Sequence, residues 1–209
     1  MKKIKITIAA ICSFMFFSLA ANAQTQKGSL KLGLNYNYSL PVSGFNTDLV
    51  SNSSPRGFAG ELMYSFTDKL QGGLSFGFQD YYQKYPRSLY PLGKTQDVSA
   101  VISNSIQTSP VTLKVKYAPL NTSAVKPYVS LGAGINIIDF KQYLGQFASS
   151  ETNAGFVAQG GLGVMVPFGR MKTSGINVGA NYNYAPYKKY NYSDLNSVNF
   201  QAGVFFAIK

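Results

Sequence analysis

The sequence predicts an all-β protein, an eight-stranded antiparallel up-and-down transmembrane β-barrel preceded by a cleaved signal peptide. Three observations predict it. An apolar segment opens the chain, apolar and polar residues then alternate with a period of two, and the connections between alternating segments are long and short in turn. We therefore expect a signal peptide at residues 1–23 and one barrel domain at residues 24–209.

The N-terminal segment has the three parts of a secretory signal. Lysines precede an apolar run at residues 6–20, and Ala21-Asn22-Ala23 fits the small-residue cleavage pattern. The run is shorter than the roughly 20 residues of a membrane-spanning helix, which favours cleavage after Ala23 over an uncleaved anchor. Cys12 is the only cysteine and lies inside this segment, so the exported chain would carry no thiol.

Eight segments alternate between apolar and polar residues as β-strands do. The first is the most regular: leucine or tyrosine occupies every second position from Leu30 to Leu40. The fourth is the least regular, because Asn104 and Pro110 interrupt its upper part. The predicted strands lie at residues 29–40, 58–66, 70–79, 98–117, 127–137, 156–166, 176–184 and 198–208.

The connections predict which end of the barrel faces outward. Long polar connections are expected at about residues 41–55, 80–98, 139–153 and 185–195, and short turns at 67–69, 119–126 and 169–175. Outer-membrane barrels have short periplasmic turns and longer loops at the cell surface. An even number of strands then places both termini on the periplasmic side.

Side-chain volume predicts that the apolar face points outward. The interior of an eight-stranded barrel is just wide enough to be filled by side chains. The apolar face carries Leu, Phe and Tyr on most strands, whereas the opposite face is mainly Gly, Ser, Asn, Ala and Gln. The bulky set therefore faces lipid. A soluble secreted barrel that binds an apolar ligand is the alternative with the faces exchanged.

Aromatic residues gather at both ends of the predicted strands, as they do at the two interfaces of a bilayer. The outer girdle is predicted to contain Tyr36, Tyr38, Phe76, Phe78, Phe156, Tyr182 and Tyr184. The inner girdle is predicted to contain Tyr64, Phe66, Tyr117, Phe168 and Phe206.

The composition argues against catalysis. The chain has no histidine, which excludes the Ser-His and Asp-His pairs that use imidazole as a general base. We expect no enzyme activity, no cofactor and no metal site. The net charge of +11 comes from scattered residues, so we expect no nucleic-acid partner. Gly-rich stretches such as 160–163 lie within strands, which favours close packing over phosphate binding.

Four charged residues are predicted to point into the lumen: Lys31, Glu61, Lys114 and Lys116. Buried charges should be paired, and Lys31 with Glu61 is one candidate pair because their strands are adjacent. Lys114 and Lys116 are expected near the periplasmic end, within reach of water. Two interpretations stay open, a packed polar plug and a narrow path for small solutes.

The outer loops hold the candidate contact residues. Tyrosine offers rigid amphipathic contact area, which predicts an adhesin-like surface; an extended aromatic belt with lysines on lipid phosphates is the alternative. The candidates are Tyr81, Tyr82, Lys84, Tyr85, Arg87, Tyr90, Lys188, Lys189 and Tyr190.

The chain resembles the small eight-stranded outer-membrane barrels of the OmpA-transmembrane, OmpX and opacity-protein type. The features that carry the resemblance are the signal, the hairpin rhythm and the segment Lys126-Pro127-Tyr128-Val129-Ser130-Leu131-Gly132-Ala133-Gly134. The resemblance implies a monomer in the bacterial outer membrane, with lipid and the barrel-assembly machinery as partners. A structural or surface-interaction role is expected, with a surface ligand that the sequence does not identify, and a narrow channel is the alternative.

Overall fold

The computed structural model describes residues 28–91, 97–120, 125–144, 147–168, 174–189 and 192–208. The predicted signal peptide at residues 1–23 lies outside these residues. The elements in chain order are β1 (Leu30–Pro41), η1 (Phe45–Leu49), β2 (Ser54–Ser65), β3 (Leu70–Lys84), β4 (Ser88–Pro91), β5 (Asp97–Ala100), β6 (Ile102–Tyr117), β7 (Lys126–Leu144), β8 (Phe147–Phe168), β9 (Ser174–Tyr184), β10 (Pro186–Lys189), β11 (Tyr192–Asp194) and β12 (Ser197–Ala207). No helix in the described ranges is long and apolar enough to cross a membrane.

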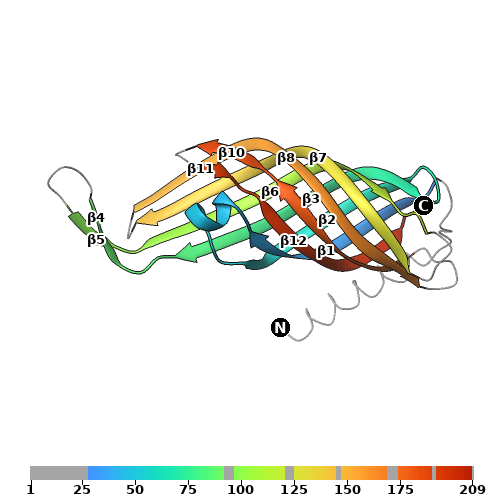
Figure 1. Ribbon diagram of the computed structural model, residues 1–209, viewed down its shortest axis with the longest axis horizontal. Coiled ribbons are helices and arrows are strands. Elements are labelled where there is room, and N and C mark those ends of the chain that lie inside the picture. Colours follow the sequence, from blue (N-terminus) through green and yellow to red (C-terminus); the bar gives the residue numbers. More distant parts are fainter. Residues whose placement is uncertain are drawn as a thin grey trace, which may run out of the picture.

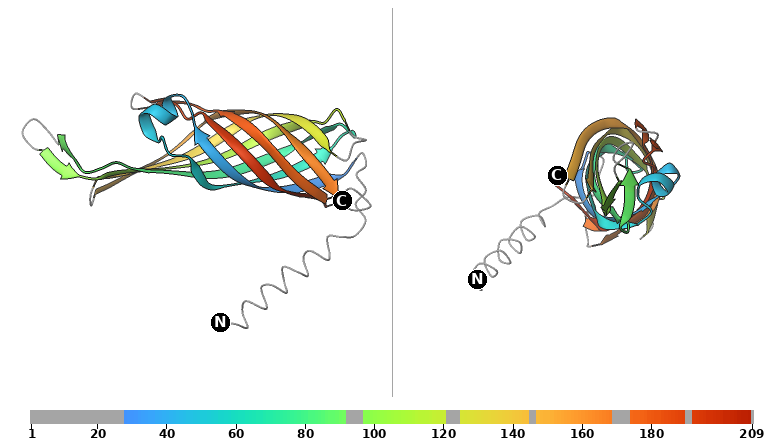
Figure 2. Two further views of the ribbon diagram at one scale, coloured as in Figure 1. Left: turned by 60° about the horizontal axis from the view of Figure 1, so that its bottom comes forward. Right: turned by 90° about the vertical axis from the view of Figure 1, so that its left-hand side faces the viewer.

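Within the described residues, eight strands close into one barrel (Figures 1 and 2). Their order around the ring is β1, β2, β3, β6, β7, β8, β9 and β12, and every neighbouring pair is antiparallel. The pairs β4–β5 and β10–β11 form small separate sheets within two of the connections. The predicted eight-stranded up-and-down barrel is confirmed.

The two ends of the barrel differ. At the short-turn end, β2 connects to β3, β6 to β7 and β8 to β9, and β1 begins and β12 ends there. The long-hairpin end carries η1, β4–β5 and β10–β11, and it is the left end in Figure 1. The predicted alternation of long and short connections is confirmed.

The outer surface of the barrel is apolar. Leu113, Leu131 and Leu162 are the most exposed of the large apolar side chains, at 70%, 72% and 66%. Aromatic side chains are exposed toward both ends, among them Tyr36 and Tyr64. The opposite positions on each strand are buried and mostly polar, which confirms the predicted orientation of the two faces.

Three strands, β3, β7 and β8, extend well beyond their predicted outer ends. β3 continues to Lys84, and β7 and β8 pair as far as Leu144 and Phe147, so the predicted loops at 80–98 and 139–153 were wrong over much of their length. The fourth barrel strand, β6, runs without a break from Ile102. At Pro110 its pairing with β3 lapses, because proline has no N–H to donate to a neighbouring strand.

The apolar outer surface of the barrel, here called the apolar belt, ends where these strands continue outward. Beyond it, the inward and outward positions exchange polarity. The outward positions become polar at Asp80, Gln107 and Asp139, and the inward ones become apolar. A strand surrounded by water must hide its apolar side chains inside, whereas a strand in lipid must expose them. The inversion therefore marks the outer edge of the belt. The inward apolar residues above it are Tyr81, Ile106, Ile138 and Val157.

Inward glycines make room for a large side chain near the short-turn end. Tyr128 is buried, and a Cβ placed on Gly163 would lie 2.5 Å from its hydroxyl oxygen and 2.6 Å from the carbonyl oxygen of Val178. This confirms the close-packing interpretation of the Gly-rich strand.

Gly163→Ala is expected to destabilise the folded barrel by about 1–3 kcal/mol, because the added methyl group overpacks the lumen. The measurement is urea unfolding in lipid vesicles. Gly160→Ala, three residues away on the outer face, is the control, since its nearest contact would be Leu131 at 3.8 Å. Equal losses in both variants would contradict the packing argument.

Candidate functional site

The lumen is lined by buried polar side chains from seven of the eight barrel strands, and β8 adds the partly buried Gln159. Asn35, Ser75, Thr112 and Asn199 are typical, each less than 8% exposed. Strand alternation explains the lining, since each lumen residue is followed in sequence by one that faces outward. The lumen is thus a polar core inside an apolar shell.

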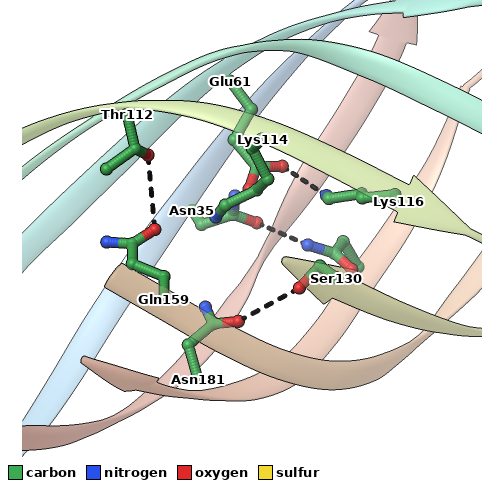
Figure 3. A network of polar contacts seen from close by, with 9 residues as sticks. Asn35, Glu61, Thr112, Lys114, Lys116, Ser130, Gln159 and Asn181 are labelled. Carbon is green, nitrogen blue, oxygen red and sulfur yellow. Dashed lines mark hydrogen bonds and ion pairs between the residues drawn. The ribbon is translucent and has the colours of Figure 1, made fainter. Parts of the chain in front are cut away.

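A carboxylate between two ammonium groups lies in the centre of this core (Figure 3). Lys114 Nζ donates to Glu61 Oε1 at 2.9 Å, and Lys116 Nζ donates to Glu61 Oε2. The three side chains are between 2% and 6% exposed. Lys116 Nζ also lies 4.9 Å from the centre of the Tyr128 ring. This arrangement, the lumen triad, ties β2 to β6 across the barrel interior.

The triad corrects two predictions about the charged lumen residues. Glu61 pairs with Lys114 and Lys116 instead of Lys31, because the strand register places Gly33 opposite Glu61 and Lys31 opposite Met63. Lys114 and Lys116 are buried rather than extended to open water. The pairing of Glu61 with Lys114 and Lys116 does not follow from strand adjacency, because β3 lies between β2 and β6 and the lysine side chains reach across the lumen.

Amide and hydroxyl groups surround the triad. Asn177 Nδ2 donates to Asn35 Oδ1 at 3.1 Å, and Figure 3 shows further contacts from Thr112 to Gln159 and from Ser130 to Asn181. Several buried amide atoms have no protein partner, which is typical of a core that is hydrated. These atoms are Asn35 Nδ2, Asn37 Oδ1, Gln79 Oε1, Asn136 Oδ1, Asn177 Oδ1 and Asn183 Oδ1.

An apolar cluster fills the lumen at the long-hairpin end. Phe45 and Leu49 of η1 are almost fully buried in it, and the Phe45 ring meets the Tyr81 ring edge-on at 4.7 Å. The Tyr81 hydroxyl shares a hydrogen bond with Ser39 Oγ. The members of this rim cluster are Phe45, Leu49, Val50, Tyr81, Ile106, Ile138, Val157, Ala185 and Leu195.

A smaller apolar cluster lies at the short-turn end. It consists of Ala118, Tyr128, Met165 and Phe205, each at most 8% exposed. The polar lumen therefore lies between apolar side chains at both ends, with the triad between them. A solute would have to displace one of these clusters as well as pass the triad.

Some of the predicted contact residues are exposed and others are buried. Tyr81 is 1% exposed and belongs to the rim cluster, so its prediction as a surface contact was wrong. The change of face at the belt edge is the reason. Tyr82 is 44% exposed on the outer face of β3, and Lys84 and Arg87 are exposed. Tyr85 is half-buried, with its hydroxyl donating to the Leu49 carbonyl at 3.1 Å.

The remaining contact candidates are placed by their backbone. Tyr90 lies in β4, and Lys188 and Lys189 lie in β10. Tyr190 lies outside the described residues.

Sequence reasoning missed the rim cluster. A constant outward apolar face places Ile106 in the least regular predicted strand and Ile138 between a predicted strand and the loop that follows it, and predicts neither as buried. The available signal is the inversion itself: Tyr81, Ile106 and Ile138 are apolar at positions in phase with the polar face of the same strands.

Comparison with known proteins shows which family this barrel belongs to. The family model described as "Outer membrane protein beta-barrel domain" matches residues 9–206. Among curated proteins, none matches the chain.

Solved structures with a similar fold include the outer membrane protein OprG of Pseudomonas aeruginosa, with 14% identity and a TM-score of 0.50 over 88% of this chain and 99% of OprG. The N-terminal β-barrel domain of OprF from the same organism has 14% identity and a TM-score of 0.47 over 87% of this chain and 98% of that domain. Ail, the attachment invasion locus protein of Yersinia pestis, solved with the heparin analogue sucrose octasulfate, has 19% identity and a TM-score of 0.43 over 86% of this chain and 97% of Ail.

The family match spans nearly all of the barrel, and the closed ring of strands is the β-barrel that the family description names. The chain belongs to the outer membrane protein β-barrel domain family and lies in the outer membrane.

Proposed function

We propose that this protein is a surface-interaction protein, which binds a macromolecule outside the cell through strands that project beyond the outer-membrane lipid. The observation that carries the proposal is a projecting sheet, formed by residues 80–84 of β3, 102–108 of β6, 138–144 of β7 and 147–153 of β8. β2 last pairs with β3 at Gln79, whereas the pairing of these four strands continues in register. A paired sheet holds its side chains in place, which lowers the entropic cost of binding.

The outer face of the projecting sheet presents tyrosine, lysine and serine. Tyr82 and Tyr143 are 44% and 42% exposed, and Ser103 lies between them: it accepts a hydrogen bond from the Tyr82 hydroxyl at 3.4 Å and pairs with Tyr143. Tyr82, Ser103 and Tyr143 form a row across the sheet, and Lys84 and Lys141 flank this row. Tyrosine with small polar neighbours is the composition of adaptable binding surfaces.

The position of one carboxylate favours this surface over an aromatic belt in lipid. Asp139 faces outward between the apolar outer surface of the barrel and Tyr143, whereas Asp80 on β3 is neutralised by Arg56, with Nη2 3.2 Å from Oδ2. Carboxylates are repelled by anionic lipid head groups, so the row at Tyr82 and Tyr143 is better placed above the head groups than among them.

The proposed role is not catalytic. The chain has no histidine to act as a general base, and the buried carboxylate Glu61 is held by Lys114 and Lys116. A narrow channel is the second function that a polar lumen suggests, but the apolar clusters at both ends favour a closed barrel.

Cells that display Tyr82→Ser/Tyr143→Ser are expected to lose at least about tenfold in adhesion, since exposed tyrosines that anchor an interface each contribute on the order of 1–2 kcal/mol. The probes are surfaces coated with fibronectin, laminin or heparin. Tyr64→Ser is the matched control, because Tyr64 is 43% exposed at the short-turn end. Adhesion that is absent in the wild type on all three probes, or lowered equally by the control, would contradict the proposal.

A shortened hairpin is the control for the projecting sheet, because it removes β4–β5 and keeps Tyr82, Ser103 and Tyr143. Residues 86–101 are replaced by an Asn-Gly turn that closes on Tyr85 and Ile102 and leaves the Lys84–Ser103 pair in place, so adhesion is expected to persist. Heat-modifiable gel migration checks the fold. Regular conductance steps from the purified wild type in planar bilayers would instead favour the channel.

A further inference from the structure

The buried charges of the lumen do not cancel. Among the described residues, the charged side chains that are buried are Lys31, Lys114, Lys116 and Glu61, which sum to three positive charges and one negative charge. Glu61 is shared by Lys114 and Lys116. Lys31 is 7% exposed and takes part in no ion pair or hydrogen bond with a described residue. A buried ammonium group without an anionic partner is costly.

The surroundings of Lys31 are cationic. The charges that act on its ammonium group are those of Lys116 and Lys126 and, from the turn between β2 and β3, the exposed carboxylate of Asp68. Its Nζ lies 6.0 Å from the centre of the Phe205 ring, a favourable but weak contact. No described residue places a carboxylate in an ion pair with the Lys31 ammonium group.

Lys31 lines a cavity at the short-turn end of the lumen, below the triad. The cavity is bounded by Lys31, Asn35, Gln71, Lys116, Asn177 and Phe205, among others. Glu61 also lines it, but two lysines hold and neutralise that carboxylate. The net charge of the cavity wall is therefore positive.

Asn35 supplies a second, independent feature. Its side chain is 4% exposed, and its Oδ1 accepts a hydrogen bond from Asn177 Nδ2 at 3.1 Å. The Asn35 Nδ2 group is buried in the same cavity wall with no acceptor. A buried donor without an acceptor is unfavourable, because it has lost its hydrogen bonds to water. Asn177 Oδ1, also without a partner, needs a donor such as water.

We propose that this cavity binds a small monovalent anion, of the halide or nitrate kind, between Lys31 Nζ and Asn35 Nδ2. The anion would neutralise the one lysine that Glu61 does not serve and accept the hydrogen bond that Asn35 has to donate. A monovalent anion pairs with the one buried ammonium group that has no anionic contact and lowers the net buried charge from +2 to +1. The cavity lies nearer the short-turn end than the long-hairpin end, against Met165 and Phe205 of the smaller apolar cluster.

Bromide is the probe, because its anomalous scattering locates it in crystals of the detergent-purified protein. The expected result is a bromide peak within hydrogen-bond distance of both nitrogens, together with a higher urea midpoint in chloride or bromide than in gluconate at equal ionic strength. In Lys31→Met the peak is expected to vanish and the apparent bromide affinity to fall at least about tenfold.

Two control variants test whether the halide effect depends on the charge at position 31. Lys69→Met removes an exposed lysine from the turn between β2 and β3 and is expected to keep both the peak and the halide effect. Lys31→Arg keeps the charge and is expected to retain halide-dependent stability if Lys31→Met fails to fold. A peak that persists in Lys31→Met, or equal midpoints in bromide and gluconate for the wild type, would overturn the proposal.

Discussion

Glu61→Gln is expected to destabilise the barrel by about 3–5 kcal/mol, because it leaves two buried ammonium groups without their carboxylate. Lys114 and Lys116 are 2% and 5% exposed and both reach Glu61 from β6. The side-chain volume is unchanged, so the loss reports the charge and not a cavity. The measurement is the free energy of unfolding in urea, from protein folded in lipid vesicles.

The matched control is the triple variant Glu61→Gln/Lys114→Met/Lys116→Met. Neutral replacement of a whole buried ion cluster is often close to neutral in stability or stabilising, so the triple variant is expected to recover most of the loss. A Glu61→Gln barrel as stable as the wild type would mean that water reaches the lysines and that the triad is not the structural centre of the lumen.

Leu131→Arg is expected to cost about 2–4 kcal/mol, the cost of a basic side chain on the lipid face near the bilayer midplane. Leu131 is 72% exposed and pairs with Val115 and Gly160 between the two aromatic girdles. In water, an arginine at so exposed a position would be close to neutral. Unfolding in vesicles therefore measures whether this face contacts lipid.

Val125→Arg is the control for position. Val125 is 48% exposed and precedes β7 at the short-turn end, where the cost of arginine falls to about 0–1 kcal/mol. Equal and small effects in both variants would contradict the membrane orientation. Equal and large effects would point to a folding defect unrelated to depth.

The sequence was sufficient for the barrel because lipid imposes a strict rule on every strand that crosses it. Leu30, Leu32 and Leu34 could be assigned outward and Lys31, Gly33 and Asn35 inward from alternation and volume alone. The short turns followed from the same pattern. Glu61 could be placed in the lumen for the same reason, as a polar residue in phase with glycine and serine.

Beyond the belt edge the rule reverses, which explains the wrong predictions there. Tyr81 was assigned to a surface loop, although it is buried in the rim cluster and hydrogen-bonded to Ser39. In water the apolar side chain turns inward and the polar one outward, so a search for one constant apolar face ends the strand too early.

The sequence by itself determined the eight alternating strands, the polar lining and the outward apolar surface, because each depends on the two-residue period of a single strand. The tertiary structure decided which charges meet. Lys114 and Lys116 reach Glu61 across the lumen, and Lys31 is left beside Asn35 without a carboxylate. Barrel closure and strand register set those distances, and neither can be read from one strand, since each is a property of the whole ring.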